Sequence, residues 1–317
     1  MAENREWWVF SEKPDLLAEL VSGVQEIAAP ERVVALVLGP RDQADRALAY
    51  GAARVIWLGE PAADCLIEDY VPTLARLIET QQPAGLLVGS TVRGRAIAGR
   101  LAARTGVTAI TDVKQFWQED SGLRARHMIF GGGAVRDERP LTGFVLATVG
   151  PGVFQASPAA ADGSGAVEEA PFVEPEWRIG LRERRNRAVS AVNLAAAKRV
   201  VCPGRGVAKK DDLGMVEELA QALGAEIACT RPLAEGLDWL PRERYIGISG
   251  ATVKPDLYLG VGVSGQVQHI VGMSGTRVVV AINKDEKAPI FEQSDYAIVG
   301  DLYTVVPALI DALKARR

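Results

Sequence analysis

The sequence has little cysteine and little histidine: three cysteines and two histidines among 317 residues. Cys65, Cys202 and Cys229 are widely spaced and form no C-x-x-C pair, which argues against disulfides and against a metal site built from cysteine. His127 lies in a strand-like segment with no second histidine nearby, so we do not expect it to bind a metal ion. These absences are typical of a protein from a reducing compartment, and they predict a cytoplasmic location.

Long apolar runs are also missing. No run approaches the roughly 20 residues that a membrane helix needs, and the first residues, MAENREWWVFSEK, lack the basic and apolar segments of a secretory signal. The net charge of −4 gives no overall attraction to nucleic acid or to an anionic membrane. The arginine-rich stretch from Arg178 to Arg187 has no interleaved aromatic residues, which favours a solvated connector over a nucleic-acid patch. We therefore expect neither nucleic-acid binding nor membrane insertion.

The first half of the chain alternates apolar and amphipathic segments, and the length suffices for two domains. Between residues 6 and 105, short apolar runs such as Val33–Leu38 alternate with helical stretches, which predicts a parallel sheet with helices on both faces. Strand-like segments continue to residue 149. They include a bend at Gly131–Gly133, which is not a phosphate loop because no Lys-Ser/Thr pair follows it. We then expect a loose loop over residues 156–170 and a strand over Val173–Ile179.

The second half repeats the alternation and adds a glycine signature. After a strand at Arg199–Cys202 and a helix at Asp211–Leu223, an apolar run leads into the pattern G-x-G-x-x-G at Gly260, Gly262 and Gly265. At the carboxyl end of a parallel strand, such glycines let the backbone approach a pyrophosphate. The same spacing also serves a tight strand-to-helix turn. The pattern alone leaves these two interpretations equal.

Two arginines follow strands of this second half. Arg205 lies in the segment PGRG and Arg231 in the segment TRP, and each comes directly after an apolar run. A guanidinium fork at the carboxyl edge of a sheet suits phosphate binding. For Arg205 the alternative is a surface ion pair, and phosphate binding is the preferred interpretation. For Arg231 a solvent-exposed loop arginine is the interpretation that the residues alone favour.

Two longer segments carry a resemblance to a known family. Residues 261–273, VGVSGQVQHIVGM, and residues 278–307, VVVAINKDEKAPIFEQSDYAIVGDLYTVVP, closely resemble the FAD-binding domain of electron transfer flavoprotein alpha subunits. The likeness runs from about Lys198 to the C-terminus and, more loosely, through the first half. It implies an α/β fold with an adenine-nucleotide-hydrolase-like βα domain over residues 1–187 and a parallel-sheet, DHS-like FAD domain over residues 188–317.

The resemblance also implies which residues contact FAD. In the family, the counterpart of Arg231 lies beside the flavin ring, that of Ser249 can bond flavin N5 or O4, and that of His269 lies beside O2. A fixed cation or donor there stabilises the negative charge that one-electron reduction places on the ring. The residues assigned to FAD in this way are Arg205, Thr230, Arg231, Ser249, Gly250, Ser264, Gly265, Gln268, His269, Asn283 and Asp301.

The remaining roles follow the family in the same manner. Ser264 and Gly265 would meet the phosphates, and Gln268 would meet the ribityl chain or the ring. Asn283 and Asp301, each at a strand end, would contact the adenosine part.

The chain departs from the family pattern at three positions. Gly150, in the segment TVGPGVF, stands where family members often carry arginine, so a local contact with a partner subunit is in question. Ile248 and Ala251, in the segment YIGISGATV, replace a glutamine and a basic residue near the flavin. These replacements imply an altered flavin reduction potential, in a direction that the sequence does not fix.

The family role is electron transport rather than enzymatic catalysis. The resemblance implies an FAD-carrying alpha subunit in a heterodimer with a beta subunit. It would accept electrons from dehydrogenases, such as the acyl-CoA dehydrogenases of fatty acid β-oxidation, and pass them to a quinone oxidoreductase or another acceptor. The resemblance leaves open whether the beta subunit holds AMP or a second FAD.

Three other functions compete with this one. An NAD-dependent dehydrogenase would use the same glycines with an acidic residue about 20 residues further on, a position that Asp285 fills. A bifurcating flavoprotein would couple NADH oxidation to two acceptors. A nucleotide-binding module without redox function would bind adenine nucleotides and no flavin.

Overall fold

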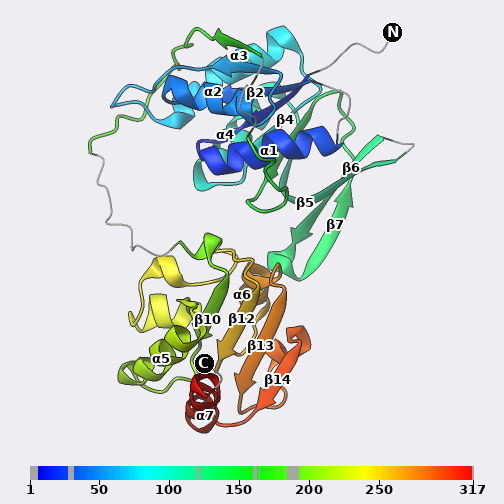
Figure 1. Cartoon of the computed structure of the whole chain (residues 1–317). Coiled ribbons are helices and arrows are strands. Elements are labelled where there is room, and N and C mark those ends of the chain that lie inside the picture. The colour runs from blue at the N-terminus through cyan, green and yellow to red at the C-terminus, as the bar shows by residue number, and fades with distance from the viewer. Residues whose placement is uncertain are drawn as a thin grey trace. The chain divides into compact units, whose positions relative to one another are not determined.

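The computed structural model describes residues 6–27, 32–119, 122–159, 163, 165–183 and 193–315. It contains two compact units (Figure 1), which consist of Met1–Ile129 with Ala134–Arg185, and of Phe130–Gly133 with Asn186–Arg317. The predicted domain boundary at Arg187 lies outside the described residues.

The first unit is built on a nine-stranded sheet in the order β7-β6-β5-β8-β4-β1-β2-β3-β9. All neighbouring pairs from β5 to β9 are parallel, whereas β5–β6 and β6–β7 are antiparallel. The strands are β1 (Trp7–Phe10), β2 (Val33–Val37), β3 (Arg54–Trp57), β4 (Gly85–Gly89), β5 (Ala109–Glu119), β6 (Gly122–Ile129), β7 (Ala134–Glu138), β8 (Val145–Val149) and β9 (Ala166–Glu169).

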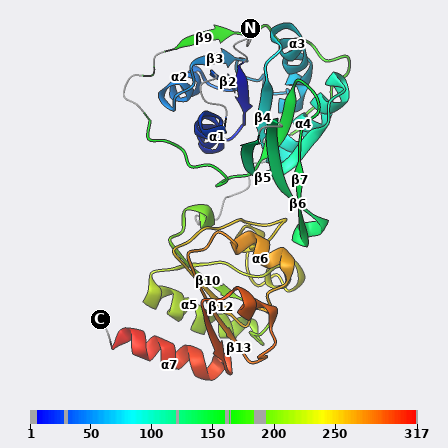
Figure 2. The same ribbon diagram turned by 90° about the vertical axis from the view of Figure 1, so that its right-hand side faces the viewer.

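Four helices cover this sheet, two on each face (Figure 2). They are α1 (Pro14–Ile27) and α2 (Arg41–Ala49) on one face, and α3 (Val71–Gln81) and α4 (Val92–Thr105) on the other. In β2, Val33 and Ala35 pack under α1 and α2, while Val34 and Leu36 pack under α3 and α4. A strand buried on both faces reads as a continuous apolar run. The prediction of a parallel sheet with helices on both faces is therefore confirmed.

Two local predictions for this unit are wrong. The segment Val173–Ile179 forms no strand, and a strand instead occupies Ala166–Glu169, inside the predicted loop. Val173 N–H instead donates to Oγ1 of Thr73 in α3 at 2.9 Å, and Trp177 and Ile179 remain exposed. β9 is polar because it is a sheet edge, where pairing with β3 rather than burial determines the strand.

The second unit has a five-stranded sheet in which every pair is parallel, in the order β11-β10-β12-β13-β14. Numbered along this unit, the order is 2-1-3-4-5, and its direction reverses between β10 and β12. In such sheets ligands bind beside the reversal, at the carboxyl ends of the strands. The strands are β10 (Arg199–Pro203), β11 (Glu226–Ile227), β12 (Leu257–Val261), β13 (Val278–Asn283) and β14 (Tyr296–Val299).

Helices again cover both faces of this sheet (Figures 1 and 2). α5 (Leu213–Leu223) and α7 (Leu302–Lys314) share one core with Val201 and Ile282, as the helical spacing of Val216 and Leu219 predicts. The short helix α6 (Val267–Met273) contributes Met273 to the opposite core. One-turn helices complete the connections: η3 (Leu194–Ala196), η4 (Lys210–Asp212), η5 (Pro232–Gly236), η6 (Arg242–Arg244) and η7 (Pro289–Gln293). The predicted α/β fold class with two parallel sheets is confirmed.

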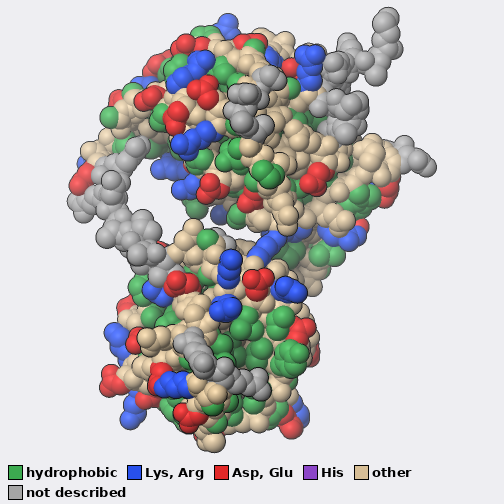
Figure 3. All heavy atoms as spheres, viewed as in Figure 1, with side chains coloured by type: hydrophobic (Ala, Val, Ile, Leu, Met, Phe, Trp, Pro, Cys, Tyr) green, Lys and Arg blue, Asp and Glu red, His purple; other side chains and the backbone are tan. Residues whose placement is uncertain are grey.

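The surface carries charges of both signs. Figure 3 shows acidic and basic side chains interspersed over the face in view. Within the described ranges, no helix combines the length and the apolar character needed to cross a membrane. All three cysteines are buried and free of disulfides.

Candidate functional site

The carboxyl edge of the second sheet brings four loops together. Because β10, β11, β12 and β13 are parallel, the residues that follow them lie along one edge. Backbone bonds join these loops: Gly204 N–H donates to Val261 O at 2.9 Å, and Thr230 N–H donates to Pro203 O at 3.2 Å. Most of the residues predicted to contact FAD therefore share this edge.

The glycines of the edge are required by close packing of the backbone. A Cβ atom on Gly204 would lie 2.4 Å from the carbonyl oxygen of Gly262, and one on Gly262 would lie 2.7 Å from Cα of Gly206. Gly265 has a φ of +82°, and its Cβ would lie 2.2 Å from the backbone nitrogen of Ile290. Loop packing thus accounts for Gly262 and Gly265 of the glycine signature, and the case for a ligand must come from other groups.

Thr230 supplies such a group. Its side chain is buried, with 9% exposure, and its Oγ1 has no hydrogen-bond partner among the residues that the structure describes. An unpaired buried hydroxyl costs about 1–3 kcal/mol, and buried polar groups rarely lack a partner. A ligand at the carboxyl edge would supply the missing one.

Two guanidinium groups stand at the same edge. Arg205 is exposed and forms no ion pair with any described residue. Arg231 Nε donates to Oε2 of Glu235 at 2.5 Å, a bond that raises the pKa of Arg231 and keeps it charged. Glu235 also accepts from Arg242 Nε at 2.9 Å. One carboxylate thus serves two arginines, which leaves net positive charge beside the edge.

Ser249 lies in the loop Ile246–Ala251, whose tip at residues 248–250 is exposed and which the protein holds from two sides. Ile246 N–H donates to Cys229 O at 2.9 Å, and Ile248 N–H donates to Gln268 O at 2.9 Å. The hydroxyl of Tyr245 donates to Ser249 Oγ at 2.8 Å. Since Ser249 accepts this bond, its own proton remains available to an acceptor such as a flavin nitrogen or carbonyl.

His269 is buried and bonded through both ring nitrogens. Nδ1 lies 3.0 Å from Ile246 O, and Nε2 lies 2.7 Å from the hydroxyl of Tyr258. Burial lowers the pKa of His269 to about 4, against a smaller opposing effect of the Ile246 carbonyl. The ring is therefore neutral at pH 7, and no ring nitrogen is left over. Because the ring is neutral, it would not act on the flavin as a positive charge. A direct hydrogen bond from His269 to the flavin stays a prediction.

The outer predicted residues already have protein partners. Asn283 Nδ2 donates to Val263 O at 2.8 Å, and its Oδ1 accepts from Asp285 N–H at 3.0 Å. Asp301 caps α7 by accepting from Tyr303 N–H at 2.9 Å. Their contacts with adenosine remain predictions.

Three predicted residues, Ser264, Gly265 and Gln268, lie between β12 and the first turn of α6. The side chains of Ser264 and Gln268 are exposed. The sequence did not single out Tyr245 and Tyr258, the partners of Ser249 and His269. A tyrosine inside an apolar strand, as in LYLGV, is the signal that could have found Tyr258, because a buried hydroxyl needs a partner.

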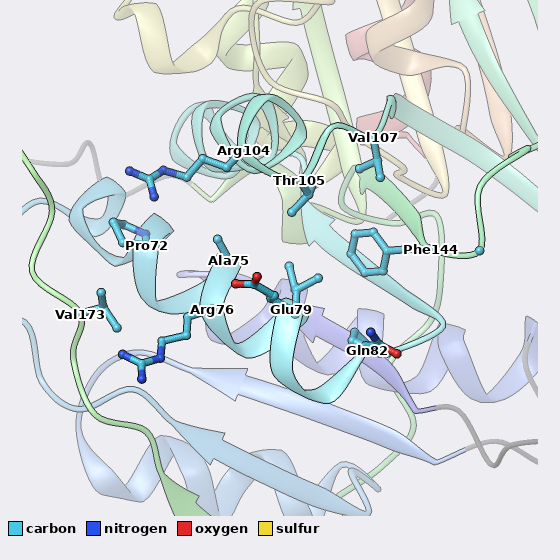
Figure 4. Close-up of a pocket in the computed structure, with 13 residues that line it drawn as sticks. Pro72, Ala75, Arg76, Glu79, Gln82, Arg104, Thr105, Val107, Phe144 and Val173 are labelled. Atoms are coloured by element: carbon cyan, nitrogen blue, oxygen red, sulfur yellow. The ribbon is translucent and has the colours of Figure 1, made fainter.

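A cavity of about 740 Å³ in the first unit is a separate feature (Figure 4). It lies between α3 and α4, beside Pro83, two residues before β4, and Phe144, the residue before β8. It is therefore at the amino ends of these strands, opposite to the edge at which parallel sheets bind nucleotides. Its arginines, Arg76 and Arg104, are exposed, so solvent already hydrates their charges and they do not require a ligand.

His127 belongs to the first unit and is also bonded within the protein. Its Nδ1 lies 3.0 Å from Thr111 O. Among the described residues, no group of three His, Cys, Asp or Glu side chains is placed to hold a metal ion.

Comparison with known proteins finds two family matches. The family described as "Electron transfer flavoprotein domain" matches residues 14–175, and "Electron transfer flavoprotein FAD-binding domain" matches residues 193–274. YdiR of Escherichia coli K12, named as an electron transfer flavoprotein subunit, is 43% identical over 313 residues, which cover 99% of both chains. Protein FixB of Escherichia coli O139:H28 is 39% identical, and that of Salmonella typhimurium LT2 is 38% identical. Each aligns over 307 residues, which cover 96% of this chain and 97% of the relative.

Proposed function

Because this chain belongs to the electron transfer flavoprotein alpha-subunit family and carries that family's FAD-binding domain, we propose that it works as one subunit of a heterodimeric electron carrier. Its cofactor is FAD. The partner in this proposal is an electron transfer flavoprotein beta subunit. The chain makes and breaks no substrate bond, so it acts as a carrier and not as an enzyme in its own right.

The unpaired hydroxyl of Thr230 is the observation that carries the proposal most directly. It lies buried at the carboxyl edge of a parallel sheet with the order 2-1-3-4-5, and Arg231 follows it in the chain. A dinucleotide has oxygen acceptors for the hydroxyl and anionic phosphates for the arginines. The residues present therefore fit FAD.

Each group would have a defined task toward the cofactor. FAD supplies the redox chemistry when it is bound. Arg205 and Ser264, after β10 and β12, would hold the phosphates, while Thr230 would donate its hydroxyl. The hydroxyl of Ser249 would donate a hydrogen bond to the flavin ring. Arg231 would stabilise negative charge on the ring, because a preorganised cation needs no reorganisation when that charge appears.

The donor and the acceptor are the finer part of the proposal. We propose dehydrogenases, including acyl-CoA dehydrogenases of fatty acid β-oxidation, as donors and a quinone oxidoreductase as an acceptor, in the cytoplasm. The support for these assignments is the family membership.

The main alternative function is that of an NAD-dependent dehydrogenase, and the hydrogen bonds of Asp285 argue against it. In that function an acidic side chain would bond a ribose hydroxyl. Here Oδ1 of Asp285 accepts from Lys287 N–H at 3.0 Å, and Asp285 N–H donates to Asn283. Asp285 therefore closes a turn after β13.

The deciding experiment is co-expression with a beta-subunit gene product, followed by an absorption spectrum of the purified pair. We expect a yellow heterodimer with one FAD bound by this chain, reducible by a dehydrogenase with its substrate. A colourless pair that takes up no added FAD would overturn the proposal. A pair that binds NAD and no flavin would support the rival.

A further inference from the structure

One buried histidine joins three separate segments of the second unit. His269 is on α6, Tyr258 is on β12, and Ile246 opens the Ser249 loop, Ile246–Ala251. The two hydrogen bonds of the His269 ring, at 2.7 Å to the Tyr258 hydroxyl and 3.0 Å to the Ile246 carbonyl, run in series from the strand to the loop.

The protonation of this chain of bonds follows from the groups themselves. A carbonyl oxygen can only accept, so Nδ1 of His269 must carry the hydrogen. In a neutral ring Nε2 is then an acceptor, and the hydroxyl of Tyr258 must donate to it. Tyr258 thereby fixes the tautomer that holds Ile246.

Tyr258 is well placed to act as the fixed end. It is fully buried, and its strand β12 is paired on both sides, with β10 and β13. The Ser249 loop is the opposite case, because Ile248, Ser249 and Gly250 are exposed. The ring of His269 therefore links a rigid strand to an exposed loop.

We propose that Tyr258 is a positioning residue of the flavin site, which acts through His269 to hold the Ser249 loop in the conformation that receives the ring. This proposal rests on the proposed function, since it concerns a loop assigned to FAD. Tyr258 itself does not touch the cofactor. Its contribution is that the loop is already ordered before FAD binds, so that binding does not have to order it.

The test is Tyr258→Phe in the complex with the beta subunit, with Tyr296→Phe as the matched control. Tyr296 is 64% exposed and undergoes the same chemical change. We expect Tyr258→Phe to weaken FAD binding about tenfold, since Nε2 of His269 then keeps only the thiol of Cys202, a weak donor 4.0 Å away. We also expect faster amide hydrogen exchange in the Ser249 loop and a shifted Nε2 resonance of His269 in 15N NMR. The control should leave all three unchanged. With two histidines in the chain, His127 serves as the internal NMR reference.

A double-mutant cycle decides whether Tyr258 acts through His269. If it does, Tyr258→Phe should have almost no further effect on FAD affinity or loop exchange in the His269→Ala background. Additive effects would overturn the proposal, and so would wild-type loop exchange and affinity in Tyr258→Phe. Should the wild-type pair bind no FAD, the proposed function fails. The loop exchange and the Nε2 resonance of the apoprotein would then still decide the link between Tyr258 and the loop.

Discussion

Each unit has a sheet edge at which the strand order reverses, and the polar groups at the two edges differ. In the first, the strand order reverses between β1 and β4, and in the second it reverses between β10 and β12. Topology alone would make both edges candidates for a nucleotide. The polar groups at the two edges show which one is open to a ligand.

At the edge of the first unit, the protein supplies most of the partners; the exception is Oε2 of Glu12, two residues after β1, which is buried and unpaired among the described residues. Thr91 Oγ1 accepts from Gly94 N–H at 2.8 Å, so the loop after β4 is a helix cap. Arg93 bonds both oxygens of Glu68, at 2.7 and 2.8 Å. These bonds satisfy the polar groups of the loop after β4 within the protein.

At the edge of the second unit, the hydroxyl of Thr230 and the guanidinium of Arg205 have no partner within the described ranges. The two sheets share a reversal of strand order and differ in the groups left unpaired: a carboxylate oxygen of Glu12 at the first edge, and a hydroxyl beside arginines at the second. A carboxylate repels a phosphate, whereas a hydroxyl and a guanidinium can donate to one. The comparison teaches that a binding edge is recognised by the chemistry of its unsatisfied polar groups, and not by its fold.

The largest effect should come from adding a side chain at a closely packed glycine on the carboxyl edge of the second sheet. Gly265→Ala would place a Cβ 2.2 Å from Ile290 N at a φ of +82°. We expect it to destabilise this unit by about 4 kcal/mol and to abolish FAD binding. Gly214→Ala is the control, because Gly214 lies in α5 with open space around its Cα. Urea unfolding should show that the control is neutral or slightly stabilised, and equal stability of the two variants would contradict the packing argument.

The pH dependence of stability should reveal the contribution of His269 to folding. Burial depresses the pKa of His269 from 6.5 to about 4, so the unfolded chain binds the proton more tightly. The contribution of neutral His269 to the free energy of unfolding is therefore fully present above pH 6.5. It is lost as the pH falls to 4, and the total loss is about 3 kcal/mol. Comparison with His269→Gln isolates this contribution, since carboxylates titrate in both proteins. Parallel stability curves for the two proteins would show that the ring is not buried as described.

Two threonines allow the comparison of the edges to be tested directly. Thr230→Val removes the unpaired hydroxyl, and we expect FAD affinity to fall while the stability of the apoprotein stays equal or rises by about 1 kcal/mol. Thr148→Val, in the first unit, removes an acceptor that Asp112 N–H uses at 2.8 Å. It should cost about 1–2 kcal/mol and leave FAD binding unchanged. Calorimetry and FAD titration measure both, and a loss of apoprotein stability in Thr230→Val would mean that the hydroxyl has a partner within the protein.

The alternation of strands and helices could be predicted from the sequence because parallel strands buried on both faces leave unbroken apolar runs. The edge strands β7 (AVRDE) and β9 (AVEE) leave no such run, since they are fixed by a neighbour across the sheet. The opposite error arose at Val173–Ile179, where apolar residues predicted a strand. Val173 N–H bonds to Thr73 of α3, and Trp177 and Ile179 are exposed, so no neighbouring strand fixes the segment.

For the site, the positions at strand ends could be predicted and the bonds between them could not. Arg205, Thr230 and Asn283 follow strands, and parallel topology brings strand ends together. The hydroxyl that meets Nε2 of His269 depends on which inward side chain of β12 reaches α6. That is decided by packing across elements, and a single sequence carries no record of it.

The smallest effect should come from the charge beside the ring. Arg231 is exposed, with Glu235 as its partner, so solvent screens much of its field. We expect Arg231→Gln to lower the flavin reduction potential by roughly 20–60 mV. Glu235→Gln is the counterpart, because it removes the opposing charge and should raise the potential by a similar amount. Spectroelectrochemical titration of the heterodimer measures both. Shifts of the same sign would show that these variants act through a change of structure, and two unchanged potentials would remove Arg231 from the flavin site.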